Sequence, residues 1–152
     1  MDPPDPLPYL GEGLMLGPLD GKAIDRLVAA AGPESGSLLA SVEVRHLGGA
    51  LHRTAPHHGA LDTLDCSFLT FALGLLFDET LRPVLRAQLD AVADAFAPYD
   101  SGRRYLNFTE APHTDPARFY KPEVYAHLRA VKQRVDPDEL FRANHAIRPN
   151  GR

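Results

Sequence analysis

The chain has 152 residues, of which 44% are hydrophobic and 24% are charged, and these values are typical of one soluble globular domain. A formal net charge of −4 argues against a nucleic-acid or anionic-membrane partner, and no apolar run approaches the roughly 20 residues that a membrane span needs. Cys66 is the only cysteine, so an internal disulfide is excluded, and without a recognisable secretory signal we expect a cytoplasmic location.

The first 18 residues are rich in proline and glycine, which predicts an extended arm ahead of a domain over 19–150. Asp20 is a suitable N-cap for a helix over 21–31, because Ile24, Leu27 and Val28 recur there on one side. Gly32 and the proline after it end the pattern. The sequence therefore predicts an arm followed by one amphipathic helix.

Two strands are predicted next. Residues 37–47 alternate, with Val42, Val44 and His46 on one face and more polar side chains on the other, as in a sheet with one wetter face. Residues 51–65 form a loop. Residues 67–77 are almost continuously apolar, which predicts a central strand with two covered faces.

A longer helix is predicted over 81–97, capped by Thr80 and ended by Pro98. Its buried stripe consists of Leu81, Leu85, Leu89, Val92 and Phe96. Residues 105–108 then return to the sheet as a third strand. This order of elements predicts an α+β fold: an antiparallel sheet with helices packed on one face.

The last third of the chain holds two more predicted helices. One begins at Pro122, which suits a first helical turn, and carries apolar residues at helical spacing. The other follows Asp136, where an acid, a proline and Glu139 make a capping box. Leu140 and Phe141 are expected to anchor that short helix, and the segment from Asn144 to Pro149 to close the chain in extended form.

The motifs of residues 104–149 resemble the C-terminal segment of FAD-linked oxidases of the berberine-bridge-enzyme type. They are Y-L-N-F at 105–108, a helix ending in V-K-Q-R-V-D-P, and L-F-R-A-N-H-A-I-R-P at 140–149. Residues 42–50, VEVRHLGGA, are more loosely similar to a middle strand of the same family, whose members include 6-hydroxynicotine and oligosaccharide oxidases. The resemblance implies a partial substrate-binding domain of a flavin oxidase.

The same resemblance implies a function and an incomplete chain. Family members pass a hydride from a small-molecule substrate to FAD, which O2 then reoxidises. They bind FAD mainly through an N-terminal domain that nothing in residues 1–40 resembles. We therefore expect the chain to be inactive alone and to need an FAD-binding N-terminal half or another polypeptide as its partner.

Three site residues follow from the resemblance. Tyr105 is implied as a catalytic residue against the isoalloxazine and substrate, and Asn107 and Asn144 as cofactor-binding residues. On a strand, Tyr105 and Asn107 would point to the same face. Some relatives have a second tyrosine, proposed as the catalytic base, where this chain has Phe108, and phenylalanine cannot take a proton. Glu43 and His46 are alternative bases, and because they lie on opposite faces of a strand at most one can reach the site.

Other residues suggest chemistry but have simpler interpretations. The adjacent His57 and His58 lack a third ligand at useful spacing, so we predict a solvated loop and no metal site. Cys66 lacks a cationic neighbour that would activate it, and we expect a small core residue.

Two further hypotheses stay open. The chain could be a non-catalytic α+β domain that self-associates, as a homodimer, or binds a partner through the sheet edge left by missing strands. The other hypothesis is that the chain is a non-functional remnant of a truncated gene.

Overall fold

The computed structural model of this chain describes residues 6–149 and contains a three-stranded antiparallel sheet. Its strands are β1 (Tyr9–Leu16), β2 (Ser41–His46) and β3 (Phe68–Leu75), in the order β1-β3-β2. β3 is the central strand, as its two-sided apolar sequence predicts. The fold is α+β, and the expectation of an antiparallel sheet with helices is confirmed.

β1 corrects the prediction of an arm over residues 1–18. Residues 1–5 lie outside the described part, but Tyr9–Leu16 pair with β3 along their whole length. Leu10, Leu14 and Leu16 alternate along the strand and are buried. The proline and glycine content of residues 1–18 masks the alternation of apolar side chains in this strand. The strand becomes stable only by pairing with β3, which is distant in the sequence.

Two helices, α1 (Gly21–Ala31) and α2 (Arg82–Phe96), cover one face of the sheet, and both predicted helices are confirmed. The Asp20 side chain accepts a hydrogen bond from the Ala23 amide at 3.0 Å, so it caps α1 as expected. Thr80 does not cap α2. The N-cap of α2 is Leu81, which makes no side-chain capping bond. Asp78 instead caps the 3₁₀ turn Glu79–Leu81 just before the helix, where it accepts from the Thr80 amide at 2.8 Å.

The main hydrophobic core lies between this face and the two helices. It contains Leu10, Leu14, Leu16, Ala23, Ala72, Leu76, Leu85, Leu89, Val92 and Phe96. Its four members from α2, Leu85, Leu89, Val92 and Phe96, all belong to the stripe predicted from helical spacing and are at most 2% exposed. Leu81, the fifth residue of that predicted stripe, lies in the turn before α2 and is only partly buried. Burial of this contiguous apolar surface is the main source of stability for residues 9–101.

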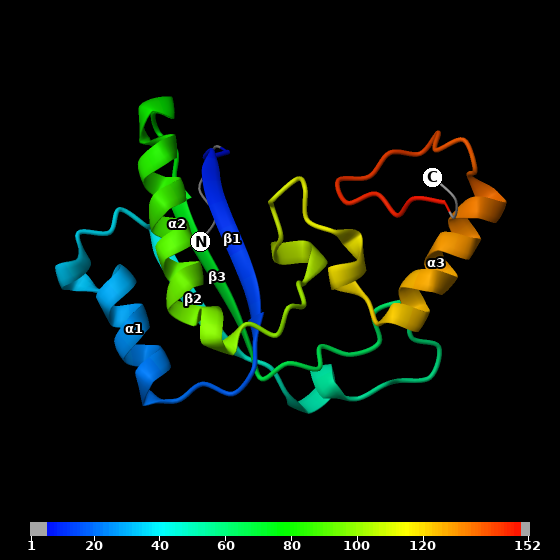
Figure 1. The fold of residues 1–152 in the computed structure, drawn as a ribbon, viewed down its shortest axis with the longest axis horizontal. Helices are drawn as coiled ribbons and strands as arrows, with labels where there is room; N and C mark the ends of the chain where they lie inside the picture. The colour runs from blue at the N-terminus through cyan, green and yellow to red at the C-terminus, as the bar shows by residue number, and fades with distance from the viewer. Residues whose placement is uncertain (1–5, 150–152) are drawn as a thin grey trace.

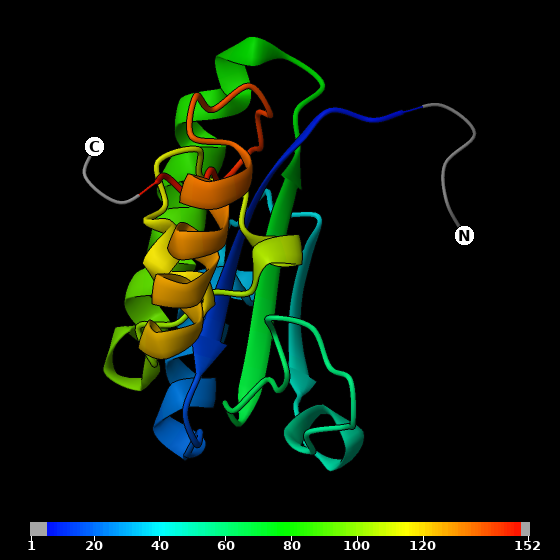
Figure 2. The same cartoon turned by 90° about the vertical axis from the view of Figure 1, so that its right-hand side faces the viewer.

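The second face of the sheet meets the C-terminal region, residues 104–149. In Figure 1 this region lies on the side opposite α1 and α2, and Figure 2 shows it in front of β1 while β2 stays uncovered. Residues 105–108, predicted as a third strand, instead contain the 3₁₀ turn Leu106–Phe108. The Tyr105 carbonyl accepts from the Phe108 amide and from the Thr109 hydroxyl, so the backbone closes on itself and does not pair with β1.

Helix α3 (Pro122–Val135) begins at Pro122 as predicted, but none of its residues is fully buried. The predicted short helix after Asp136 is wrong. The Asp136 carboxylate accepts from the Leu140 and Phe141 amides and folds residues 137–141 into turns. Leu140 and Phe141 are 79% and 78% exposed, so they do not anchor this segment.

Within residues 6–149, none of the helices combines the length and the apolar character required to cross a bilayer.

Candidate functional site

A cavity of about 1000 Å³ lies within the C-terminal region. One wall is the segment 106–112, and the other is the closing segment 141–147, with Tyr120 and Lys132 between them. Its polar lining consists of Asn107, Thr109, Glu110, Tyr120, Lys132, Arg142, Asn144 and His145. A concave site with a few converging polar groups on an apolar background is the usual form of a small-molecule site.

Two of the three predicted site residues line this cavity. Asn107 and Asn144 come from opposite walls and are both exposed. Tyr105 does not line it, but its phenol oxygen accepts a hydrogen bond from the Asn107 side-chain amide at 3.1 Å. The structure therefore joins Tyr105 to Asn107 through a hydrogen bond in a tight turn, not through the strand alternation expected from the sequence.

The turn that carries Asn107 is held against the second face of the sheet by Phe108. The Phe108 ring stacks on Tyr105 at 5.7 Å and meets Phe71 edge-on at 5.2 Å. The Arg45 guanidinium lies 4.7 Å from the centre of the same ring. Gly13 is required beneath it, because a side chain at this position would collide with the Phe108 carbonyl oxygen.

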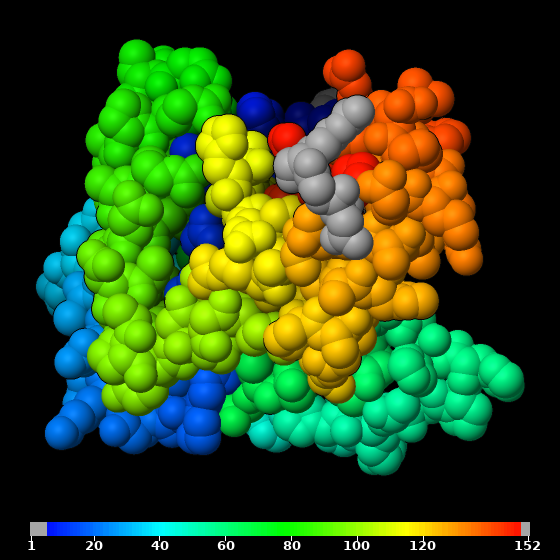
Figure 3. Space-filling view, turned by 45° about the vertical axis from the view of Figure 1, so that its right-hand side comes forward, coloured from blue at the N-terminus to red at the C-terminus, as the bar shows by residue number. Residues whose placement is uncertain are grey.

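An ion pair fixes the chain just before this turn. Arg104 is 9% exposed and donates to both carboxylate oxygens of Asp100, at 2.8 and 2.9 Å. Burial raises the pKa of Asp100, but the Arg104 guanidinium and the Gly102 amide outweigh it and lower this pKa below its ordinary value. Figure 3 shows the surface here: β1 is visible between α2 and the segment that follows Arg104.

The closing segment is held mainly by polar contacts. The Lys132 ammonium pairs with Asp136, and this hydrogen bond, with those from the Leu140 and Phe141 amides, lowers the pKa of Asp136. The Arg129 guanidinium donates to the Arg148 and Pro149 carbonyls at 3.3 and 3.2 Å. These contacts return the chain end alongside α3 (Figure 1).

His145 connects the closing segment to the opposite wall. Its Nε2 lies 2.9 Å from the Thr109 carbonyl oxygen, and its ring packs on Phe119 at 4.8 Å between centroids. Its Nδ1 is buried and has no hydrogen-bond partner among the described residues. Residue types and spacing did not indicate His145, because neither of these contacts is local in the sequence.

Tyrosines near the cavity have perturbed acidity. Burial raises the pKa of Tyr120. A hydrogen bond to Glu110, followed by burial, raises the pKa of Tyr9 at the start of β1. Both phenols therefore keep their hydrogen at neutral pH, and Tyr9 donates it to Glu110.

The two alternative bases lie on opposite faces of β2, as expected. His46 is on the helix-covered side, with its ring 5.3 Å from Phe68. Glu43 is on the side that carries Phe71 and Phe108, where it accepts from Arg45 Nε at 2.7 Å. Of the two residues, only Glu43 shares a face with the Tyr105 turn.

The loop histidines and the cysteine have local roles. Among residues 6–149, no group of three or more histidine, cysteine or acidic side chains is arranged to hold a metal ion. Cys66 is buried beside Met15, Leu47 and Leu69, so the prediction of a small core residue is confirmed. His52 Nε2 lies 3.0 Å from the Cys66 carbonyl oxygen, which ties the loop to the start of β3.

Residues 104–148 match the model of the family "Berberine and berberine like". Over 117 residues the chain is 32% identical to (R)-6-hydroxynicotine oxidase of Paenarthrobacter nicotinovorans, an alignment that covers 76% of this chain and 25% of that protein. The chain therefore spans about a quarter of the length of the curated relative that it matches.

Solved structures share the fold. BBE-like 1 of Physcomitrella patens superposes with a TM-score of 0.76 at 15% identity, over 96% of this chain and 31% of that one. Xylooligosaccharide oxidase from Myceliophthora thermophila C1, in complex with xylobiose, superposes with a TM-score of 0.69 at 22% identity, over 94% and 33% of the two chains. At these identities the likeness establishes the fold alone.

Proposed function

We propose that this chain supplies the substrate-side wall of a flavin oxidase site. The chain is similar to (R)-6-hydroxynicotine oxidase, and its residues 104–148 match the berberine-like family. The observation that carries the proposal is the position of Asn107 and Asn144. They are far apart in sequence and lie on opposite walls of one cavity. The family resemblance associates these two residues with the flavin.

The residues present fit one side of an FAD site. The cavity, at about 1000 Å³, is at the upper end of the usual range for ligand pockets. Carboxamides at Asn107 and Asn144 can both donate to and accept from the polar edge of a flat ring, and Leu106 and Ile147 supply apolar wall. FAD, when bound, accepts a hydride from the substrate and returns the electrons to O2.

Tyr105 is the catalytic residue of the proposal. Its phenol oxygen accepts from the Asn107 amide, so its own O–H hydrogen stays available to donate to a substrate heteroatom. Stacking on Phe108 keeps the ring on the second face of the sheet. Because Phe108 cannot take a proton, Glu43, which lies on the same face of the sheet, is the carboxylate that would accept one.

In this proposal, an FAD-binding part outside the 152 residues completes the site. The chain covers between a quarter and a third of its relatives, and the second face of the sheet is open near β2 (Figure 2). The missing wall belongs to an FAD-binding part, either covalently continuous with this sequence or separate, and the chain by itself is inactive.

A complementation experiment tests this function. (R)-6-hydroxynicotine oxidase is truncated to remove the region that aligns with this chain, and FAD is titrated into each part alone and into the mixture while flavin fluorescence is measured. We expect quenching in the mixture beyond the sum of the parts. Asn107→Ala and Asn144→Ala each weaken binding roughly three- to tenfold, the value of one net hydrogen bond.

Gln133→Ala, a carboxamide removed from an exposed position of α3, is the matched control and leaves the affinity unchanged. If the mixture never binds FAD more tightly than its parts, or if all three variants behave alike, the proposed function is wrong.

A second candidate function is association without catalysis. In the described residues β2 pairs only with β3, so its outer edge has free backbone groups, and Phe77 is 72% exposed at the end of β3. Such edges pair with other chains. Sedimentation velocity distinguishes this hypothesis: a concentration-dependent dimer supports it, and a monomer at high concentration argues against it.

A further inference from the structure

His145 is the point where the two walls of the cavity meet. Its Nε2 lies 2.9 Å from the Thr109 carbonyl oxygen. A carbonyl oxygen can only accept, so Nε2 must carry the hydrogen. In the described part of the chain, no other hydrogen bond joins residues 141–147 to residues 105–112.

The rest of the ring has a fixed environment. Nδ1 is buried and has no partner among the described residues. A hydrogen on Nδ1 would leave a buried donor unsatisfied, whereas a bare lone pair costs less. The face of the ring packs on Phe119, itself 2% exposed. The hydrogen bond at Nε2 and the buried, unpartnered Nδ1 thus select the same state, a neutral imidazole with hydrogen on Nε2.

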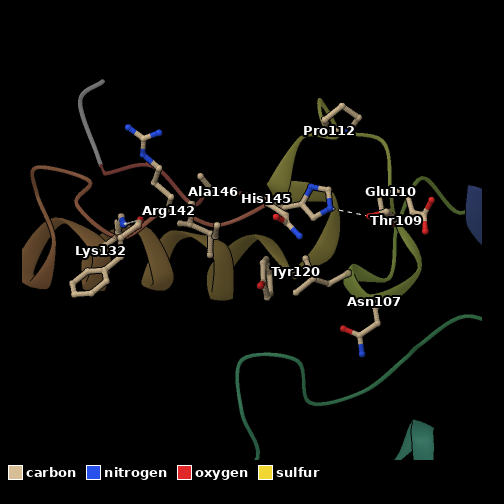
Figure 4. A pocket seen from close by; sticks show the side chains of 14 residues that line it. Asn107, Thr109, Glu110, Pro112, Tyr120, Lys132, Arg142, His145 and Ala146 are labelled. Carbon is tan, nitrogen blue, oxygen red and sulfur yellow. Dashed lines mark hydrogen bonds between the residues drawn. The ribbon is translucent and has the colours of Figure 1, made fainter. Parts of the chain in front are cut away.

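The bond connects the residues that carry the proposed site. Thr109 follows the turn that contains Asn107, and His145 is adjacent to Asn144. Figure 4 shows the histidine reaching across from the closing segment to Thr109. The bond therefore links the two segments from which the carboxamides extend.

We propose that His145 is a positioning residue: as a neutral Nε2–H imidazole it clamps the closing segment to the 105–112 segment and so sets the separation of Asn107 and Asn144. The clamp is a property of this chain alone. Its consequence for flavin binding rests on the proposed function.

The first test needs no variant. Long-range ¹H–¹⁵N correlation spectra of the uniformly labelled chain at neutral pH report which ring nitrogen carries the hydrogen. We expect His145 to show a single neutral Nε2–H tautomer, while the exposed His127 shows averaged tautomers. An Nδ1–H tautomer at His145, or averaging like that of His127, overturns the proposal.

The second test separates the hydrogen bond from the packing. His145→Gln keeps a donor that reaches Thr109, and His145→Phe keeps a ring against Phe119 without the donor. We expect backbone ¹⁵N order parameters at Ala146 and Ile147 to fall from about 0.85 towards 0.6 in His145→Phe. His145→Gln should stay near the parent value, and His127→Gln should leave it unchanged.

Equal order parameters in the Gln and Phe variants overturn the clamp. Should His145→Phe fail to fold, the tautomer and the His145→Gln result still decide the question. In the complemented mixture, FAD affinity should drop roughly three- to tenfold in His145→Phe and recover in His145→Gln. If no mixture binds FAD, the proposed function fails while the NMR tests of the clamp remain valid.

Discussion

The two halves of this molecule are stabilised by different kinds of interaction. Residues 9–101 bury a contiguous apolar core between the sheet, α1 and α2. Residues 104–149 contribute few buried apolar side chains, Phe119 among them, and α3 buries none fully. The Phe108 turn packs on the sheet through aromatic contacts. The rest of this half depends mainly on directed polar contacts such as Arg104 with Asp100, Lys132 with Asp136 and His145 with Thr109.

The difference shows how stability and function are divided. Hydrophobic burial is strong but non-directional, so it supports a scaffold. Hydrogen bonds contribute less but fix orientation, which a site needs. The cavity accordingly lies entirely in residues 104–149, the half held mainly by polar contacts. Four predictions test this contrast.

A phenylalanine-to-alanine substitution in each half should give the greatest difference in stability. Phe96→Ala empties a position in the core that is 0% exposed and should lower the free energy of unfolding by about 3–5 kcal/mol. Phe141→Ala, at 78% exposure, should change it by less than about 0.5 kcal/mol. Urea denaturation followed by circular dichroism measures both. Comparable losses would mean that the two halves do not differ in this way.

Gly13→Ala tests the contact between the halves. The added methyl group meets the Phe108 carbonyl oxygen, a backbone atom that cannot rotate away. We expect a loss of about 1–3 kcal/mol and NMR shift changes concentrated in residues 105–110. Gly21→Ala, where nothing lies within 4 Å, is the control, and it should be neutral or slightly stabilising. A neutral Gly13→Ala would show that the 105–110 segment is free to move off β1.

Asp100→Asn tests the ion pair between Asp100 and Arg104, which lies at the start of the C-terminal half. Because Arg104 is buried and Asp100 is only partly exposed, we expect a loss of roughly 1–3 kcal/mol at pH 7. The pKa of Asp100 is lowered in the folded protein. The ion pair therefore stabilises the fold fully above the pKa of the unfolded chain, near 3.8. This stabilisation is lost as the pH falls through the lower pKa of the folded protein. Stability measured between pH 5 and acid should therefore fall more steeply in the parent than in Asp100→Asn. Parallel curves would contradict the assignment.

The smallest effect concerns Arg45 above the Phe108 ring. A half-exposed cation–π contact contributes about 0.5–1 kcal/mol, so Arg45→Ala should cost no more than this. Arg45→Lys should recover part of it, because lysine keeps the charge but not the planar group. Arg53→Ala, an exposed arginine of the 51–65 loop, serves as the control. A loss well above 1 kcal/mol would indicate that Arg45 has a larger structural role than this contact.

Elements whose signals are local could be predicted from the sequence. Asp20 and Pro122 mark helix starts through their own side chains, and the stripe from Leu85 to Phe96 repeats at helical spacing, so α1, α2 and the start of α3 were predicted correctly. The continuous apolar character of β3 was equally sufficient for a central strand. The motifs of the last third of the chain also indicated Asn107 and Asn144 as site residues, through the family resemblance.

The remaining features depend on contacts between segments or on competition among hydrogen bonds. Tyr9–Leu16 becomes a strand because β3 offers an edge, and residues 105–108 become a turn because the Tyr105 carbonyl finds partners within the turn. Asp136 caps backbone amides of a turn where its pattern predicted a helix. His145 joins Thr109 across 36 positions. Each of these contacts depends on groups distant in sequence or on competition between alternative hydrogen bonds, and no local pattern encodes either.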